Sequence, residues 1–326
     1  MKPSVVSGIK PSGKLHIGNY LGMVKQSIAL QHSDKYQCYY FIADYHSLTQ
    51  DYLVKEKSAE IFDLAIDLLA LGVDPKKSVL FIQSDVMEHA NLAWLLSCVT
   101  PAGQLQGMIE FREKVAEGQS ANAGLLNYPV LMAADILSYK ANFVPVGEDQ
   151  RQHLELTRDV ARAFNKRFGK TFPEPKSLFV EGLRIKSLDN PDKKMSKSLP
   201  KGCLYLTDSP EIIEKKIRSA VTDSGSEIAF DPKNKPAIAN LLLIYSEMSD
   251  TPIKDIVKNY RGASYKEFKE NMAKEISSSL SDFRARRTAI AGDPKKVREV
   301  FLAGAHKASL VASETLREAK KKVGLI

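Results

Sequence analysis

Two polar segments far apart in the chain have the residue types that bind a polyphosphate. The first is Lys10–Asn19, with the sequence KPSGKLHIGN, between a strand-like and a helix-like run. Ser12 and Gly13 suit a tight turn, and a helix N-terminus favours phosphate. His16 and Asn19 are three residues apart, so they share one helix face, from which His16 can donate to a phosphate oxygen. The alternative is an N-capping turn with an incidental histidine.

The second segment is Lys193–Ser198, with the sequence KKMSKS, between Asn190-Pro191 and Pro200. It offers three lysines and two serines and little apolar surface to bury. We expect a mobile loop whose ammonium groups close over a polyphosphate. The alternative is a solvated linker between domains. The occurrence of both segments in one chain predicts a nucleoside triphosphate site held from two sides.

The elements that must position these residues alternate between strand and helix in the first half. Predicted strands are Val5–Ile9, Tyr39–Ala43, Val79–Ile82 and Phe143–Val146, and predicted helices are the segment after His16, Lys55–Leu71 and Asn91–Val99. This order predicts an α/β domain, a Rossmann-type parallel sheet with helices on both faces. Ligands bind beyond the carboxyl ends of such strands, where Asp44, His46 and 147–149 also lie.

The second half reads as helix only, so we expect a smaller all-helical domain. Its predicted helices begin at Pro210, after the capping residue Ser209, and cover Ala237–Met248, Tyr265–Leu280 and Val297–Lys322. The expected domains are a catalytic domain over 1–190, a mobile loop over 191–200, a helical domain over 201–300 and a C-terminal helix over 301–326. Whether that last helix packs back on the catalytic domain is left open by the sequence.

Composition bounds the class of protein. The 326 residues carry a net charge of +8, and basic clusters such as 215–218, 284–287 and 295–298 attract nucleic acid or simply form solvated helix faces. We find no signal peptide, membrane-spanning run or prenylation motif, so we expect a cytoplasmic protein with no membrane partner. Three scattered cysteines, Cys38, Cys98 and Cys203, predict neither disulfides nor a zinc site, and no protein-held metal is expected.

The two polar segments resemble the HIGH and KMSKS signatures of class I aminoacyl-tRNA synthetases, with Asn19 in place of the last histidine. The likeness to the tryptophanyl-tRNA synthetases of bacteria extends from about residue 3 to the C-terminus, and is carried by 7–13, 44–49, 128–137, 144–150, 155–159, 164–168 and 220–224. The resemblance implies a homodimer of Rossmann-type catalytic domains, which hold the dimer interface, with helical anticodon-binding domains.

The resemblance also implies two reactions. The carboxylate of L-tryptophan attacks the α-phosphorus of ATP, with Mg²⁺ assisting and pyrophosphate leaving. The tryptophanyl group then passes to the terminal ribose of the tRNA for tryptophan, and AMP leaves. A displacement of this kind needs in-line positioning and cations more than covalent help.

Site residues follow from the matching positions. Those assigned to catalysis are His16, Lys114, Lys194 and Lys197. Those assigned to ATP are Lys10, Pro11, Ser12, Gly18, Asn19, Gly147, Glu148, Asp149, Ile185, Lys194, Met195, Ser196, Lys197 and Ser198. Asp149 would accept from the ribose hydroxyls, Ile185 would flank adenine, and Lys114 would contact pyrophosphate.

Residues assigned to the amino acid are Val6, His46, Glu110, Tyr128, Met132, Asp135, Val144, Val146 and Gln150. A carboxylate such as Asp135 in an apolar pocket is costly unless paired, and the indole N–H is a donor-only group that suits it. Phenylalanine would leave Asp135 unpaired, which predicts rejection by roughly 10⁴ or more. The alternative for Asp135 is a carboxylate on a helix surface. We expect His46 to orient substrate or transfer a proton, and His89 and His153 show no partner pattern.

The chain departs from the family at four positions. Lys10 and Glu110 stand where glutamine is frequent, Val6 replaces a common phenylalanine beside the indole, and Leu199 replaces an aspartate. Lys10 and Glu110 form a hypothetical compensated pair, with positive charge at the substrate carboxylate and negative charge at its ammonium.

Three other functions compete with this interpretation. A tyrosyl-tRNA synthetase has the same fold and signatures, but Met132 and Asp135 favour an indole over a phenol. A small-molecule adenylyltransferase would not explain the basic helical half. A non-catalytic tRNA-binding paralogue would not need His16, Lys194 and Lys197. The anticodon contacts stay open.

Overall fold

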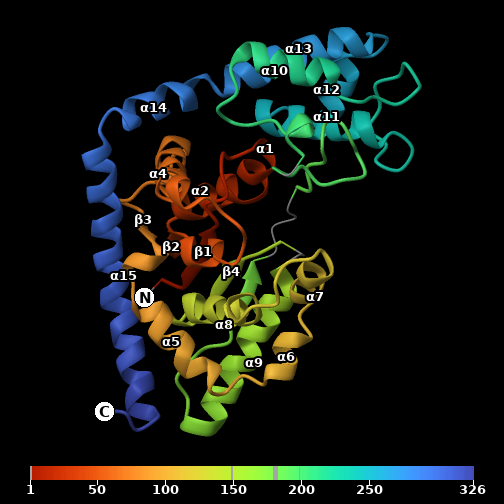
Figure 1. Ribbon diagram of the computed structural model, residues 1–326. Coiled ribbons are helices and arrows are strands. Elements are labelled where there is room, and N and C mark those ends of the chain that lie inside the picture. The colour runs from red at the N-terminus through yellow and green to blue at the C-terminus, as the bar shows by residue number, and fades with distance from the viewer. Residues whose placement is uncertain (1, 148–149, 179–182, 198) are drawn as a thin grey trace. The chain divides into compact units, whose positions relative to one another are not determined.

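The computed structural model describes residues 2–147, 150–178, 183–197 and 199–326 (Figure 1). Its internal contacts divide the chain into two units. Unit 1 comprises Met1–Ser12, Gln26–Glu181 and Asp293–Ile326, and unit 2 comprises Gly13–Lys25 and Gly182–Gly292. The assignment of catalytic and anticodon-binding domains to residue ranges stays a prediction.

The described part of unit 1 contains one parallel sheet of five strands in the order β3-β2-β1-β4-β5. The strands are β1 (Ser4–Ile9), β2 (Gln37–Ile42), β3 (Ser78–Ile82), β4 (Phe143–Pro145) and β5 (Lys176–Leu178). In register, Val6 pairs with Tyr39 and Tyr39 with Val79. The order changes direction at β1, so the ends of β1 and β4 form the switch point at which such sheets bind ligands.

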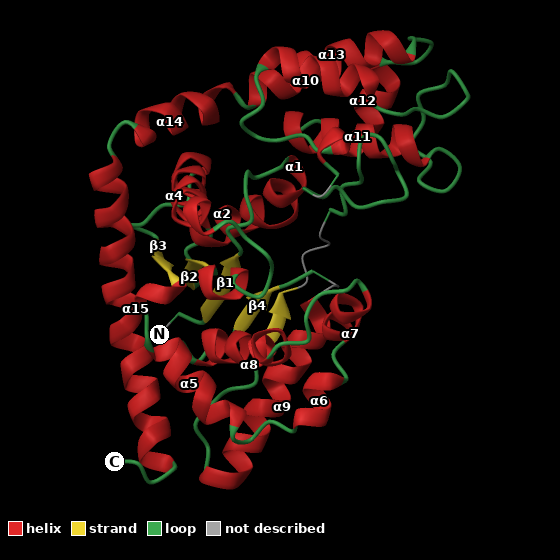
Figure 2. Cartoon of the chain, in the orientation of Figure 1, coloured by secondary structure: helices red, strands yellow, loops and turns green. Residues whose placement is uncertain are grey.

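Helices cover both faces of this sheet, with α2 and α4 on one side and α5, α8 and α9 on the other (Figure 2). The unit's helices are α2 (Lys25–His32), α3 (Asp44–Ser47), α4 (Val54–Leu71), α5 (Glu88–Ser97), α6 (Ala102–Gln106), α7 (Ile109–Ala116), α8 (Ala123–Leu137), α9 (Arg151–Phe168) and α15 (Pro294–Lys322), with a 3-10 turn, η2 (Gln83–Asp85). The Rossmann-type α/β prediction is therefore confirmed.

The C-terminal helix α15 packs against β3 and α5 within unit 1 (Figure 1). Small residues allow its close approach, because a Cβ added to Gly304 would lie 1.8 Å from the carbonyl oxygen of Leu80. Ser309 and Ser313 also donate to the Glu88 carboxylate of α5, at 2.8 and 2.5 Å. The helix thereby covers a sheet edge that would otherwise expose unpaired backbone groups.

Unit 2 is helical in its described residues. Its elements are α1 (Ile17–Asn19), the π-helical segment η1 (Tyr20–Val24), the 3-10 turn η4 (Pro200–Gly202), α10 (Pro210–Ser219), α11 (Pro236–Ser249), α12 (Ile253–Asn259), α13 (Tyr265–Ser279) and α14 (Ser281–Ala291). Ser209 caps α10 by accepting the N–H of Ile212 at 3.4 Å, as its sequence predicts. The core of unit 2 includes Ile213, Ile217, Phe268 and Met272, all below 1% exposed.

None of the helices that the structure describes is long and apolar enough to cross a bilayer.

Candidate active site

The part of the first polar segment from Gly13 to Asn19 belongs to unit 2 and is held there by backbone pairing. Gly13 turns the chain with a φ of 84°, a conformation that favours glycine. Leu206 donates to the carbonyl of Leu15 at 3.0 Å, and Ile17 donates to the carbonyl of Leu204 at 2.9 Å. These bonds tie the segment to the chain that follows the lysine-rich segment.

His16 is the N-cap of α1 and is only 5% exposed. The ring Nδ1 of His16 accepts the backbone N–H of Asn19 at 3.2 Å, and the backbone N–H of His16 donates to Asn19 Oδ1 at 3.2 Å. Burial, reinforced by Lys197 and then Lys194, lowers the pKa of His16 to about 4. A neutral imidazole whose Nδ1 accepts must carry its proton on Nε2. The capping alternative therefore describes the local structure correctly and still leaves Nε2–H as a donor.

The lysine-rich segment forms backbone hydrogen bonds with residues 185–187. Met195 donates to the carbonyl of Ile185 at 3.0 Å, and Ser187 donates to that of Lys193 at 2.9 Å. Met195 and Ile185 are each 2% exposed, so the segment buries more apolar surface than its composition suggests. Its mobility stays a prediction.

Within unit 2 the two polar segments meet. Lys197 Nζ donates to the carbonyl oxygen of Gly13 at 2.9 Å. A Cβ on Gly18 would lie 3.0 Å from the His16 ring and 3.6 Å from Ile185 Cβ, so Gly18 lets these side chains approach. His16, Gly18, Ile185 and Lys197 thus form one neighbourhood, with a neutral donor, an ammonium group and an apolar wall.

In unit 1, Asp135 of α8 is the centre of a buried polar network. Its carboxylate is 1% exposed, and it accepts from His46 Nε2 and His89 Nδ1, each at 2.7 Å. Gln83 Nε2 donates to both carboxylate oxygens, at 2.8 and 2.9 Å. Burial acts to raise the pKa of Asp135, but the bonds from the two histidines outweigh it and the pKa is lowered.

This network corrects two sequence-based expectations. Asp135 is not a helix-surface carboxylate, because it lies inside unit 1. It is also not unpaired without an indole, since three side chains already donate to it. A carboxylate has about four acceptor positions, and four contacts use them. An indole N–H can reach this carboxylate only by displacing one of these donors.

A second polar cluster surrounds Tyr128 of α8. The Tyr128 hydroxyl lies 2.6 Å from His153 Nε2, and His153 Nε2 lies 3.7 Å from Glu110 Oε2. Burial, followed by the charge of Glu110, raises the pKa of Tyr128. Lys10 Nζ lies 5.5 Å from the centre of the Tyr128 ring, close enough for a cation–π contact.

The electrostatics couple Lys10 to Glu110. Burial lowers the pKa of Lys10, Glu110 partly raises it again, and Lys114 lowers it. Lys114, in the last turn of α7, forms an ion pair at 2.9 Å with Glu117, the residue that follows this helix.

Apolar residues assigned to the indole gather in one cluster of unit 1. Val6 and Val144 are 1% and 3% exposed, and Met132 and Val146 pack against the same cluster. Gln150 donates its N–H to the Gly147 carbonyl at 3.0 Å, and Lys57 Nζ donates to the Pro11 carbonyl at 3.4 Å. Glu148, Asp149 and Ser198 lie outside the described residues.

Sequence reasoning missed Gln83, His89, Tyr139 and His153. Gln83 directly follows β3, and that position after a parallel strand was the available signal. His89 links Asp135 to the Tyr139 hydroxyl, 2.6 Å from its Nε2. Nothing in the sequence pairs His89 or His153 with residues 25 to 50 positions away.

No described group of three or more His, Cys, Asp or Glu side chains is arranged to hold a metal ion. Among the described residues around His16, the charged groups that act on it are the ammonium groups of Lys194 and Lys197. Mg²⁺ prefers carboxylate, phosphate and water oxygens, so these residues do not fit a protein-held Mg²⁺.

A parallel sheet with its switch point at β1 and β4, together with a helix N-terminus that meets a lysine-rich segment, defines a nucleotide-binding α/β enzyme. The sequence model of the class I tRNA synthetases for tryptophan and tyrosine matches residues 1–281. The chain belongs to this family.

Relatives match over nearly their whole length. The tryptophan--tRNA ligase of Caldanaerobacter subterraneus subsp. tengcongensis is 47% identical, over 99% of this chain and 98% of the relative. Tryptophanyl-tRNA synthetase from Mycoplasma pneumoniae has a similar structure, with a TM-score of 0.89, 37% identity and coverage of 99% and 98%. Tryptophanyl-tRNA synthetase from Campylobacter jejuni, solved with ADP and tryptophan, has a TM-score of 0.85 and 35% sequence identity. The match covers 98% of this chain and 99% of that one.

Proposed function

We propose that this chain is a tryptophan–tRNA ligase, which activates L-tryptophan with ATP and transfers it to the tRNA for tryptophan. The observation that carries the proposal is the contact of Lys197 Nζ with the Gly13 carbonyl, at 2.9 Å, in a chain of this family. It brings a lysine of one signature to the loop that precedes the other. The relatives that match along nearly the whole chain are named as tryptophan--tRNA ligases.

In the first step a carboxylate oxygen of tryptophan attacks the α-phosphorus of ATP in line with the departing pyrophosphate. The P–O bond to the β-phosphate breaks, and tryptophanyl-adenylate forms. His16 donates its Nε2–H to a phosphate oxygen, and Lys194 and Lys197 neutralise the charge that develops. Lys114 contacts the pyrophosphate, Ile185 and Gly18 flank adenine, and Asp149 accepts from the ribose hydroxyls. Mg²⁺ is proposed to arrive bound to the triphosphate rather than to protein carboxylates.

Tryptophan is selected in unit 1. Val6, Met132, Val144 and Val146 contact the ring, and Asp135 accepts the indole N–H in place of the bond from His46. We assign the displacement to His46 because it belongs to the four-residue helix α3 and is 5% exposed, whereas Gln83 and His89 are both fully buried. Tyr128, Glu110 and Gln150 face the ammonium group, and Lys10 faces the carboxylate.

In the second step a ribose hydroxyl of the terminal adenosine attacks the carbonyl carbon of the adenylate. The tryptophanyl ester forms, and AMP leaves with the bonding electrons. Since ATP and tRNA are its substrates, the proposed location is the cytoplasm.

The proposed assembly is a homodimer. Unit 1 exposes large apolar side chains at α5 and α7. Trp94 of α5 is 72% exposed, Met87 at the start of α5 is 68% exposed, and Ile109 of α7 is 51% exposed. Exposed apolar surface of this kind favours a protein partner. Light scattering of the purified protein checks the assembly, and a monomer at micromolar concentration contradicts it.

The test is exchange of labelled pyrophosphate into ATP with each of the twenty amino acids. We expect exchange with tryptophan alone, and exchange driven by tyrosine instead overturns the proposed substrate. A variant with Lys194→Ala and Lys197→Ala should lose roughly 10²-fold or more in kcat. Lys193→Ala is the matched control, because the hydrogen bonds of Lys193 in the described part of the chain come from its backbone, which donates to Asn190 at 3.1 Å and accepts from Ser187 at 2.9 Å. Equal exchange by all three proteins contradicts the mechanism.

A further inference from the structure

A histidine and a tyrosine that the proposed mechanism does not use lie behind the Asp135 carboxylate. His89 of α5 is fully buried, and Tyr139, which follows the end of α8, is 4% exposed. His89 Nδ1 lies 2.7 Å from Asp135 Oδ1, and His89 Nε2 lies 2.6 Å from the Tyr139 hydroxyl. The three side chains therefore form a chain of two hydrogen bonds that ends on the carboxylate assigned to the indole.

The direction of both hydrogen bonds follows from the protons that these groups carry. The pKa of Asp135 is lowered, so its carboxylate can only accept and His89 carries a proton on Nδ1. Burial, followed by the charge of Asp135, raises the pKa of Tyr139, so the hydroxyl keeps its proton. Within the described part of the chain His89 Nε2 is the acceptor at hydrogen-bond distance from this hydroxyl. Tyr139 therefore donates to Nε2, and His89 is the neutral Nδ1–H tautomer.

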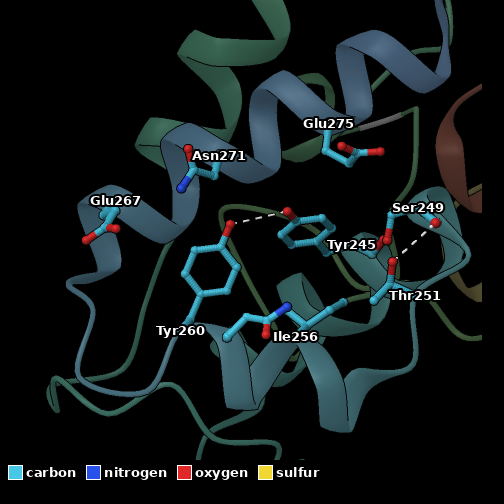
Figure 3. A pocket seen from close by; sticks show the side chains of 9 residues that line it. Tyr245, Ser249, Thr251, Ile256, Tyr260, Glu267, Asn271 and Glu275 are labelled. Carbon is cyan, nitrogen blue, oxygen red and sulfur yellow. Dashed lines mark hydrogen bonds between the residues drawn. The ribbon is translucent and has the colours of Figure 1, made fainter.

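The hydroxyl pair of Tyr245 and Tyr260 in unit 2 shows the difference from an undirected bond (Figure 3). Those two oxygens lie 3.3 Å apart, and either of them can be the donor. The bond from Tyr139 runs one way only, because a neutral imidazole that donates from Nδ1 offers a lone pair at Nε2. A tyrosine at this position thus selects one of the two tautomers of His89.

Aromatic rings hold the His89 ring in its orientation. Phe41 and Phe81 meet it edge to face, with ring centres 5.9 and 5.8 Å from its own. Tyr39 in turn stacks on the Tyr139 ring at 4.4 Å. Edge-to-face and stacked pairs have specific geometries, and a close-packed interior leaves an imidazole little room to turn. The Nδ1–H is therefore aimed in one direction.

The two carboxylate oxygens of Asp135 have different partners. Oδ1 accepts from His89 Nδ1, whereas Oδ2 accepts from His46 Nε2 at 2.7 Å. Gln83 donates to both oxygens and does not distinguish them. His46 is the donor that the indole N–H replaces in the proposed function, so Oδ2 is the oxygen that contacts the substrate. The terminal torsion of an aspartate has a broad minimum, and the bond from His89 to Oδ1 restricts it.

We propose that His89 and Tyr139 are positioning residues for the selection of tryptophan, an inference that rests on the function proposed above. Tyr139 holds His89 in the Nδ1–H tautomer, and His89 then directs Oδ2 of Asp135 at the indole N–H. Both residues act through Asp135 rather than through a contact of their own with the amino acid. Metal-binding histidines are oriented by carboxylates in the same way, and loss of the orienting partner there costs roughly 10–100-fold.

The test compares tryptophan with an analogue in which the sulfur of a benzothiophene replaces the indole N–H. A misdirected Asp135 lowers kcat/KM for tryptophan in pyrophosphate exchange, but it spares the analogue, which has no N–H to donate. General damage to unit 1 lowers both values together. The ratio of the two kcat/KM values therefore separates positioning from structural support.

His89→Gln and His89→Asn are the matched variants, because an asparagine amide takes the place of Nδ1 and a glutamine amide that of Nε2. We expect His89→Gln to lower the ratio roughly 10–100-fold and His89→Asn to restore part of it. Tyr139→Phe should also lower the ratio, whereas Tyr40→Phe should leave it unchanged. Tyr40 is the control because it is a buried tyrosine of the same unit whose hydroxyl donates to the Ser27 carbonyl at 2.8 Å.

An unchanged ratio in His89→Gln overturns the positioning role, and so does an equal fall in both kcat/KM values. If His89→Gln does not fold, Tyr139→Phe decides by the same ratio, since it removes a single oxygen atom and keeps the ring. Either negative result leaves the proposed function standing, because the unmodified enzyme still exchanges pyrophosphate with tryptophan. Absence of that exchange in the unmodified enzyme instead overturns the proposed function, and the positioning role with it.

Discussion

His16 Nδ1 accepts the backbone N–H of Asn19 at 3.2 Å, so the side chain that caps helix α1 is the same one that we propose as a donor to phosphate. His16→Asn separates these roles, because asparagine is a good N-cap but lacks the Nε2–H. We expect His16→Asn to keep the thermal midpoint and lose roughly 10²-fold or more of pyrophosphate exchange. His16→Ala should also lose about 0.5–2 kcal/mol of stability. Equal stability losses in both variants would contradict the capping role.

The pH dependence of stability should report the same histidine. Its pKa is about 4 in the folded chain and near 6.5 when unfolded, so between these values the unfolded chain binds more protons. Stability must then fall as pH is lowered from 6.5 towards 4. Urea unfolding at pH 7 and pH 5 should show a larger loss for the unmodified protein than for His16→Asn. Identical losses would place the His16 pKa at its ordinary value.

Lys10 and Glu110 should behave as a coupled pair. Glu110 raises the pKa of Lys10 against the effect of burial, so Glu110→Gln should lower that pKa and move the alkaline limb of the exchange rate to lower pH. Lys10→Gln should weaken activation and remove that limb. The double variant should depart from the sum of the two single changes. Strict additivity, with no movement of the alkaline limb, argues against the coupling.

The sequence predicts best those helices and strands that have long apolar patterns. The bounds of β1, β2, β3 and α4 lie within one or two residues of those expected, since apolar spacing reflects burial directly. Helix α4 ends at a left-handed C-cap, Gly72, with a φ of 103°. β5 has three residues and was not predicted. Among the described strands it pairs with β4 alone, and so short a run leaves no local pattern.

The candidate site likewise has one part that the sequence predicts and one part that it does not. The His16 and Lys197 neighbourhood was predictable because each segment carries its own chemistry in consecutive residues. The donors around Asp135 were not, because Gln83 and His89 reach it across 52 and 46 positions. The sequence analysis expected Asp135 to be unpaired until an indole N–H binds. A buried charge needs hydrogen-bond partners within the folded chain itself, and here these are side chains distant in the sequence.

That network gives a stability prediction. Asp135→Ala leaves three buried donors without their acceptor, and removing one partner of a buried charged network costs roughly 3–5 kcal/mol. Asp85→Ala is the control, since Asp85 is also an aspartate of unit 1 but is exposed. Urea unfolding should show a large loss for the first and a small one for the second. Similar values for the two would mean that the Asp135 contacts add little to the fold.

The packing of α15 on β3 gives the last prediction. A Cβ on Gly304 would lie 1.8 Å from the Leu80 carbonyl oxygen and 2.7 Å from its carbon, and neither the strand nor the helix backbone can yield cheaply. Gly304→Ala should therefore destabilise unit 1 by about 1–3 kcal/mol or more, although alanine is the better helix former. Gly103→Ala, in helix α6 with no atom within 4 Å of the added Cβ, should gain about 0.4–1 kcal/mol. Chemical unfolding of the two variants beside the unmodified protein measures both changes. A gain for Gly304→Ala equal to that for Gly103→Ala would mean that α15 does not approach β3 so closely.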